Sequence, residues 1–497
     1  MKCTPVISII FLLFLGLQSC IKEDPVNTDP GIKLRYSTDT LLFDTTFTTI
    51  GSATKILKIF NDESGPVILS RISIAGSSGV KFNFNVDGIE GPEAKNIRIE
   101  AKDSIYLFVR VKVDPDQPLS VSPFVLEDKL KIEINSHTNE IALVAWGQNA
   151  NYITGKDASG RIVLLTCNMQ DLRWDDSKPY LIYGTLVIDS CRVIIPAGAR
   201  IYIHGGLVRP DDDRIAPYTD GRLIFINRGS LAIEGTPGNK AYLTGDRLEA
   251  AFKNGAGQWG GIAFQNPGRT NSISNADIKN SSFGLYVDSA AFLQIDHSRI
   301  IYTSTNSIIA RNAIIKASNC EFTESGQHNL YFAQGGNYTL DYCTAYNAYS
   351  NSYSLLLDNF QCTMQNPQTG QCIEGKTLPA TIKVRNSIFA GEDDNEVVLV
   401  DRNPTPIPGR FVVQFSNSYI KGDSLQNSSS FKDNCIDCLY AKFGDKLFES
   451  IKQSNYQLDS ASVAKNIGKP IPGISDDLLG KSRDSVLPDA GCYESQK

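Results

Sequence analysis

The sequence has little of what metal-dependent enzymes, nucleic-acid binders and membrane-spanning proteins usually show. Histidine occurs only four times in 497 residues, at no spacing typical of zinc ligands: His137, His204, His297 and His328. No basic cluster is present, and 54 acidic residues outnumber 48 Lys and Arg, so no nucleic-acid partner is expected. The apolar run at residues 6–15 has ten residues, whereas a spanning helix needs about 20.

The first twenty residues have the order of a secretory signal: Lys2, the apolar run, and LQSC at residues 17–20. This tetrapeptide resembles the lipobox of bacterial lipoproteins, in which the chain is cut before the cysteine and the cysteine is acylated. The resemblance implies a signal peptide at residues 1–19 and an anchor in outer-membrane lipid through acylated Cys20, because two or three acyl chains hold a bilayer stably. The alternative is an ordinary signal peptide with a chance cysteine at the cut.

Residues 20–34 are polar and contain proline, and we expect them to form a tether. Lys22, Glu23 and Asp24 resemble the short charged signal that sends Bacteroidota lipoproteins to the outer face of the outer membrane. The sequence therefore predicts a lipid-anchored protein of the outer membrane that faces the cell exterior.

Eleven cysteines are present, of which Cys3 leaves with the signal and Cys20 carries lipid. The remaining nine lie in a compartment where disulfides persist, and an odd number leaves at least one thiol unpaired in a monomer. We predict a disulfide between Cys362 and Cys372 that closes an excursion loop without strands at residues 359–379. The alternative is two free thiols in that insert.

Two further cysteine pairs have structural interpretations. Cys435 and Cys438 form a CxxC outside any βαβ context, which favours a local structural pair over a redox site. Cys320 and Cys343 occupy equivalent positions of neighbouring repeats, where parallel side-chain vectors give poor disulfide geometry. We expect these two thiols to stack, unpaired, in a core.

Residues 35–148 contain five short segments in which apolar and polar residues alternate. They are KILKIF (55–60), RISIAG (71–76), IYLFVRVKV (105–113), KLKIEI (129–134) and EIALVAWG (140–147). Alternation with a period of two, broken by turn-forming clusters, predicts an antiparallel, immunoglobulin-like β-sandwich. No catalytic constellation appears in it.

A repeat follows a linker or N-terminal cap at residues 149–178. Apolar pairs five residues apart recur, with first members 22, 22, 23, 44 and 31 residues apart: Ile273 with Ile278, Ile295 with Ile300, Ala317 with Phe322, Leu340 with Ala345, Val384 with Phe389, and Phe415 with Ile420. In four of six pairs the residue two past the first member is Asn, which readily adopts left-handed backbone at a turn. A third apolar strand follows each of the first five pairs. The pattern predicts a parallel β-helix over residues 179–440 and a C-terminal cap segment at 441–497.

Several segments carry a resemblance to a known family. LVRPDDDRIAPYTDGRLIFINRGSLAIEGT (207–236), GQWGGIAF (257–264) and PDAGCYE (488–494) resemble Bacteroidota surface lipoproteins of the right-handed parallel β-helix repeat (pectin lyase-like) type with an N-terminal immunoglobulin-like domain. The family usually has Ala where this chain has Cys492. The resemblance implies an all-β protein, a right-handed parallel β-helix preceded by a sandwich, and leaves function mostly unassigned.

Candidate ligand or metal residues fall in acidic runs and at strand ends. The runs are RPDDDR, with Asp211, Asp212 and Asp213, and GEDDNE, with Glu392, Asp393, Asp394 and Glu396. Each repeat of the β-helix is called a rung. The residues that close the third strand of successive rungs are Asp288, Arg311, Gln334, Asp358 and Asp401, and their positions predict a polar column. Solvated turns and ordinary strand ends are the alternative interpretation.

Function is predicted in two forms. A rigid surface that binds or displays glycans without catalysis is the leading prediction. Trp259 is a candidate sugar platform, but packing of a turn beside two Gly is the favoured interpretation. A cluster of Tyr331, Tyr338, Tyr342 and Tyr346 forms an aromatic glycan face only if the rings point outward, which the sequence leaves open. The alternative, by analogy of fold alone, is a polysaccharide lyase or hydrolase acting on acidic polysaccharides, with calcium held by the carboxylates. No catalytic residue is assigned, because the paired-Asp, Gly-His-Gly and Arg-x-Lys pattern of polygalacturonases is absent.

Overall fold

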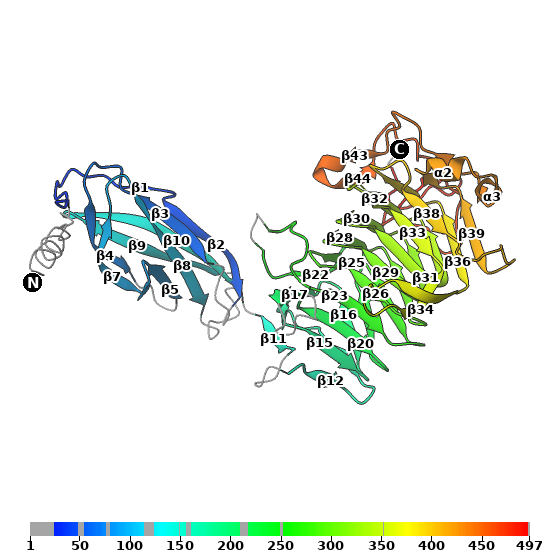
Figure 1. Ribbon diagram of the computed structural model, residues 1–497, viewed down its shortest axis with the longest axis horizontal. Coiled ribbons are helices and arrows are strands. Elements are labelled where there is room, and N and C mark those ends of the chain that lie inside the picture. The colour runs from blue at the N-terminus through cyan, green and yellow to red at the C-terminus, as the bar shows by residue number, and fades with distance from the viewer. Residues whose placement is uncertain are drawn as a thin grey trace, which may run out of the picture. The chain divides into compact units, whose positions relative to one another are not determined.

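A computed structural model describes residues 24–47, 54–75, 80–113, 124–148, 150–155, 161–208, 217–248, 252–350 and 352–495. The chain divides into two compact units, Met1–Asn149 and Ala150–Lys497 (Figure 1). Within the described residues, no helix has the length and hydropathy needed to cross a bilayer. The predicted signal peptide and Cys20 lie outside the described residues.

The first unit is a β-sandwich of two five-stranded sheets. One sheet has the order β1 (Arg35–Tyr36), β3 (Lys55–Phe60), β8 (Ser104–Val113), β5 (Val80–Val86), β6 (Ile89–Gly91). The other has the order β2 (Thr40–Phe47), β10 (His137–Gln148), β9 (Phe124–Ile134), β4 (Val67–Ile74), β7 (Glu93–Ile99). Each of the five predicted segments overlaps a strand, and alternate residues such as Leu57 and Leu69 are fully buried between the sheets. The predicted antiparallel pairing is present except at one edge, where β2 runs parallel to β10.

The second unit is a right-handed parallel β-helix with three faces. The first face consists of β12 (Leu164–Thr166), β15 (Leu186–Asp189), β20 (Arg222–Ile226), β23 (Gly261–Gln265), β26 (Leu285–Val287), β29 (Ile308–Ser318), β31 (Leu330–Asp341), β33 (Leu355–Asp358) and β38 (Val397–Val400). The second consists of β13 (Asp171–Arg173), β16 (Arg192–Pro196), β21 (Ser230–Glu234), β24 (Thr270–Ser274), β27 (Phe292–Asp296), the later halves of β29 and β31, β36 (Ala380–Arg385), β39 (Phe411–Ser416) and β41 (Cys435–Ile436).

The third face is a separate parallel sheet of eleven strands. Its members are β11 (Asn151–Thr154), β14 (Tyr180–Tyr183), β17 (Arg200–His204), β22 (Ala241–Gly245), β25 (Ala276–Lys279), β28 (Arg299–Thr303), β30 (Glu321–Ser325), β32 (Thr344–Asn347), β37 (Ile388–Gly391), β40 (Tyr419–Ile420) and β42 (Leu439–Tyr440). Because β11, β12 and β13 already pair with the next rung, residues expected to form a linker or cap contribute strands to the helix.

The predicted apolar rows stack in register. On the second face Ile273 pairs with Ile295, Ile295 with Ala317, and so on through Leu340, Val384 and Phe415. On the third face Ile278, Ile300, Phe322, Ala345, Phe389 and Ile420 form the matching row. Both rows are buried in one continuous core, which confirms the interpretation of the repeat.

The turn between these rows is left-handed in every one of the six rungs, as predicted. The φ angles are 49° at Asn275, 51° at Asn319, and 49° at both Asn386 and Asn417. His297 and Tyr342 take the same place at 46° and 52°. A left-handed residue is strained for most side chains and least so for Asn, which explains the Asn preference.

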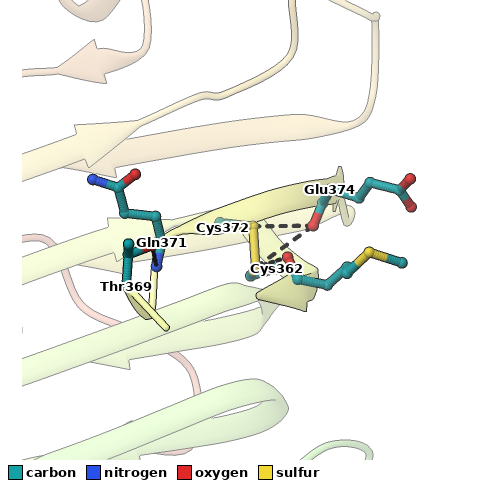
Figure 2. Close-up of a disulfide and its surroundings, with 6 residues drawn as sticks. Cys362, Thr369, Gln371, Cys372 and Glu374 are labelled. Carbon is teal, nitrogen blue, oxygen red and sulfur yellow. Dashed lines mark hydrogen bonds between the residues drawn. A yellow bond between two sulfur atoms is a disulfide. The ribbon is translucent and has the colours of Figure 1, made fainter. Parts of the chain in front are cut away.

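The insert at residues 359–379 differs from the loop that the sequence predicts. It is an antiparallel hairpin of β34 (Phe360–Gln365) and β35 (Cys372–Thr377). Figure 2 shows the disulfide between Cys362 and Cys372 that joins the two strands. Further short pairs are β18 (Leu207–Val208) with β19 (Tyr218–Thr219), and β43 (Phe448–Ser450) with β44 (Asn455–Leu458).

The other cysteines lie at the two ends of the helix, in its core and in the C-terminal segment. A disulfide that the sequence did not suggest joins Cys167 to Cys191, and Cys435 is joined to Cys438. Cys320 and Cys343 are free and fully buried, as expected for stacked core thiols, and Cys492 is likewise free and buried.

Two segments outside the strands pack against the β-helix, one between β40 and β41 and one after β44. The short helices α2 (Asp423–Gln426) and α3 (Ser429–Lys432) place Phe431 5.3 Å from Phe415 and so cover the open end of the core. Residues 462–495, which we call the C-terminal strap, instead lie along the side of the helix. Asn417 donates to the carbonyl of Ile467, and Asn386 donates to that of Lys469.

Candidate functional site

The predicted acidic sites receive limited support. Asp211, Asp212 and Asp213 lie outside the described residues. Among the residues that the structure describes, no group of three or more His, Cys, Asp or Glu is placed to hold a metal ion. A calcium site therefore stays a prediction.

The GEDDNE run is organised around a buried carboxylate rather than an open site. Glu396 is fully buried, and its carboxylate accepts hydrogen bonds from the backbone N–H groups of Ser354 and Asp393, both at 2.9 Å. Burial raises the pKa of Glu396 to about 7. Asp393 and Asp394 thus lie in a turn whose shape the buried glutamate fixes.

The predicted polar column is not one column. Arg311 pairs with Ala333 rather than Gln334, and Asp358 pairs with Val400 rather than Asp401. The register shifts after Arg311, where β29 bends from the first face to the second. This shift follows the Arg311–Ala333 pair, so it does not cause the two mispairings. Gln334 and Asp401 were each placed one residue beyond the true partner.

The column residues lie at the carboxyl edge of the first face. Asp401 accepts hydrogen bonds from Asn359 at 2.7 Å and from the backbone of Asn403 at 3.0 Å, which is a turn-stabilising role. Asp358 faces Arg402 at 3.4 Å. Asp288 and Arg311 both lie beside Tyr286, and the Arg311 guanidinium carbon is 5.6 Å from the centroid of that ring.

The outward residues of the first face form an apolar column. In register, Tyr286 pairs with Ile309, Ile309 with Tyr331, Tyr331 with Leu356, and Leu356 with Val398. Each is partly exposed, whereas its neighbours in the strand, such as Leu285 and Val287, are buried. Five rungs at a spacing of about 4.8 Å give this outer column a length of roughly 19 Å.

Three more rings extend the column sideways. The ring of His328 stacks on that of Tyr353 at 5.0 Å and 4°, and meets Tyr331 edge-on at 5.8 Å. Phe283 meets Tyr286 edge-on at 6.4 Å. We call Phe283, Tyr286, His328, Tyr331 and Tyr353 the aromatic patch.

The histidine of this patch behaves as a neutral ring. His328 Nδ1 accepts a hydrogen bond from the backbone N–H of Tyr353 at 2.9 Å, so this nitrogen carries no proton. Burial lowers the pKa of His328, which also favours the neutral form. The patch therefore presents uncharged aromatic surfaces, with Arg311 and Asp288 as polar groups at one edge.

Most of the aromatic residues proposed from sequence are in the core. Trp259 is fully buried, and its Nε1 donates to the carbonyl of Lys279 at 2.8 Å. Tyr338 and Tyr342 are fully buried and Tyr346 is 5% exposed, so only Tyr331 of the predicted tyrosine cluster lies on the surface. The central tyrosine of the triplet LYV (285–287) was the missed signal, because the middle residue of a buried–exposed–buried strand points outward.

No family model matches the sequence, and no curated protein matches it. The chain is similar to the solved structure of pectate lyase Pel9A, at 13% identity over 70% of this chain and 88% of that chain, with a TM-score of 0.32. It is similar to XylC in complex with xylose at 9% identity over 92% and 88%, with a TM-score of 0.32. A protein of unknown function from Porphyromonas gingivalis W83 matches at 12% identity and a TM-score of 0.17, over 28% of this chain and 59% of its own length. These values are too low to transfer a function.

Proposed function

We propose that the first face of the β-helix is a non-enzymatic binding surface for polysaccharide. The observation that carries the proposal is the aromatic patch, which adjoins an outer column of partly exposed apolar side chains in register over five rungs. Flat rings suit the apolar faces of sugar rings, and a straight repeat suits a linear polymer. The polar edge at Asp288 and Arg311 offers hydrogen-bond partners for hydroxyl groups.

Cell-surface display is the second part of the proposal. Acylation of Cys20 would tether the protein to the outer membrane, and residues 20–34 would separate the folded units from the lipid. A rigid helix of stacked rungs holds a binding face in a fixed geometry, which limits the entropy lost on binding. Cell-envelope or environmental glycans are the partners that this location supplies.

The test measures polymer binding and turnover together. The chain lacking residues 1–20 is titrated with neutral and uronate polysaccharides, with and without calcium, while the formation of unsaturated product is followed in the ultraviolet. We expect retention of at least one polymer without product, and a loss of about tenfold or more in affinity for Tyr331→Ala, the size typical of a buried aromatic contact. Tyr242→Ala is the matched control, because Tyr242 is an exposed tyrosine on the third face.

Two results would contradict the proposal. Calcium-dependent product formation would make the protein a polysaccharide lyase, the alternative class. Binding that Tyr331→Ala and Tyr242→Ala weaken equally, or not at all, would remove the first face as the binding surface.

A further inference from the structure

A cavity of about 650 Å³ lies on the third face, beyond the first-face site. Its volume falls in the range of small-ligand sites, roughly 300–1,000 Å³. Tyr346, Gly391 and Tyr419 line it from the third-face strands, and Lys421 follows β40. The loop at residues 441–447 forms the opposite wall. None of its lining residues belongs to the aromatic patch.

The floor of the cavity is a rigid part of the helix. Tyr346 packs edge-on against Phe448 at 5.8 Å, and its hydroxyl donates to Glu392 at 2.6 Å. A Cβ on Gly391 would come within 2.0 Å of Glu396 Oε1, so glycine is required beside the cavity. Lys421 Nζ is fixed by the carbonyl oxygens of Gly391 and Glu392 at 2.9 and 3.1 Å.

The wall carries an aromatic ring on a pinned turn. Asp445 accepts hydrogen bonds from the backbone N–H of Lys442 at 2.8 Å and from the hydroxyl of Tyr419 at 3.2 Å, which fixes the turn to the third face. Gly444, at φ 87°, completes this turn. Phe443 at its tip is 110% exposed, the highest value among the described large apolar side chains. A single exposed apolar residue is ordinary on a surface, but this ring is held at the rim of a cavity.

The charges around the cavity nearly balance. Four aspartates and three lysines line it, and the structure records no hydrogen bond or ion pair for the side chains of Asp394, Asp423, Lys442 and Lys446. A hydroxyl both donates and accepts, so a neutral polyol can satisfy carboxylates and ammonium groups alike. An anionic ligand would be repelled by the aspartates, and a cationic ligand would be repelled by the lysines. Either ligand could therefore use only part of these polar groups.

We infer that this cavity binds one or two units of a neutral saccharide, with the ring of Phe443 stacked on the apolar face of a sugar. The ligand is thus a chain end or a short oligosaccharide, whereas the first face is proposed to hold an extended polymer. Phe443 supplies the stacking surface. The carboxylate of Asp394 can accept a hydrogen bond from a sugar hydroxyl, and the ammonium group of Lys442 can donate one.

The experiment titrates the chain lacking residues 1–20 with D-glucose, D-xylose, cellobiose and N-acetylglucosamine as neutral probes, and with D-galacturonate and D-glucosamine as charged probes, by calorimetry. At least one neutral probe is expected to bind more tightly than both charged probes. Phe443→Ala should weaken that binding about tenfold or more, and Phe443→Trp should preserve it.

Matched variants separate this site from folding effects and from the first face. Val486→Ala is the control, since Val486 is 69% exposed and does not line the cavity. Phe443→Ala should leave the Tm unchanged because the ring makes no buried contact, and Tyr331→Ala should leave small-sugar binding unchanged even if it abolishes polymer binding. Absence of binding by every neutral probe, tighter binding of a charged probe, or an unchanged affinity in Phe443→Ala would overturn the inference. Self-association that Phe443→Ala removes would also overturn it, because the ring would then contact a second copy.

Discussion

Arg483 Nη2 donates a hydrogen bond to Oδ1 of Asn319 over 2.7 Å, although 164 residues separate them in the sequence. The same guanidinium contacts Glu494 at 3.2 Å and lies 3.8 Å from the centroid of the Tyr342 ring. The side chains of Arg483 and Glu494 are only 3% and 6% exposed. One buried cation therefore ties the C-terminal strap to two neighbouring rungs, at their left-handed turn positions.

Replacing this cation should release the strap. Arg483→Ala leaves Glu494 buried without its partner, and breaking a buried ion pair on one side typically costs about 3–5 kcal/mol. We expect a lower Tm and faster cleavage of the strap in limited proteolysis. Lys469→Ala is the control, because its ion pair with Asp437 is largely exposed and should contribute no more than about 1 kcal/mol. Equal effects of the two substitutions would contradict the buried-cation account.

The buried Glu396 should make stability depend on pH. Its pKa is about 7 in the folded protein against 4.5 for the ordinary group, so the folded state binds the proton more tightly. The resulting stabilisation is complete below pH 4.5 and is lost as the pH rises through about 7. Between pH 5 and pH 8 the wild-type Tm should therefore fall more than that of Glu396→Gln. The variant also loses an acceptor at every pH, so the slope is the readout, and parallel slopes would show that Glu396 does not titrate in this range.

On the second face, truncation of a side chain in the inner row should lower the stability much more than truncation of an outward-facing side chain. Ile295 is fully buried in the second-face row, and Ile295→Ala should destabilise by about 2–5 kcal/mol through lost burial and the cavity left behind. Ile314 lies one rung further on the same face, but it is 40% exposed. Ile314→Ala should change stability by no more than about 0.5 kcal/mol. The comparison of urea midpoints checks the inward assignment, which a similar cost at both positions would refute.

Two of the disulfides should differ in what they stabilise. Cys362–Cys372 lies in a hairpin where Met364 and Ile373 are 50% and 58% exposed. Replacing both cysteines with Ser should leave the Tm nearly unchanged and should increase protease cleavage within the hairpin.

The disulfide at the start of the helix is the comparison. Cys167–Cys191 spans 24 residues and joins the first two rungs, beside the β12–β15 and β13–β16 pairs. Its removal should lower the Tm, because this disulfide links two rungs of the helix and a disulfide typically stabilises the folded state by about 2–4 kcal/mol. A larger Tm loss from the hairpin pair than from this pair would reverse the assignment.

The repeat was predictable residue by residue where each rung is regular. Ile273, Ile295 and Ala317 recur at steps of 22, so their pairing could be read from spacing. Asn275 and Asn319 could be placed in left-handed turns because few other residues tolerate that backbone. The prediction failed at Gln334 and Asp401 on the first-face edge, because the sequence does not mark to within one residue where a strand ends, and a slip of one residue gives the wrong partner.

The candidate site was only partly predictable. Arg311 and Asp288 were identified as strand-end polar residues, and the structure adds that both lie beside Tyr286. Trp259 is a core residue, in line with the favoured interpretation that it packs a turn. Tyr338, whose direction the sequence left open, is also in the core, because aromatic character alone does not distinguish a packed ring from an exposed one.

The sequence alone determined the coiled architecture, since apolar side chains at fixed intervals can be buried only by stacking one rung on the next. Tertiary structure decided which rings lie on the first face, how Phe443 comes to stand at a cavity rim, and where the C-terminal strap attaches. These features join residues far apart in the chain, as Arg483 joins Asn319, and no local periodicity encodes such contacts. They depend on the exact register of the stacked rungs and on the irregular segments between them, which only the folded chain fixes.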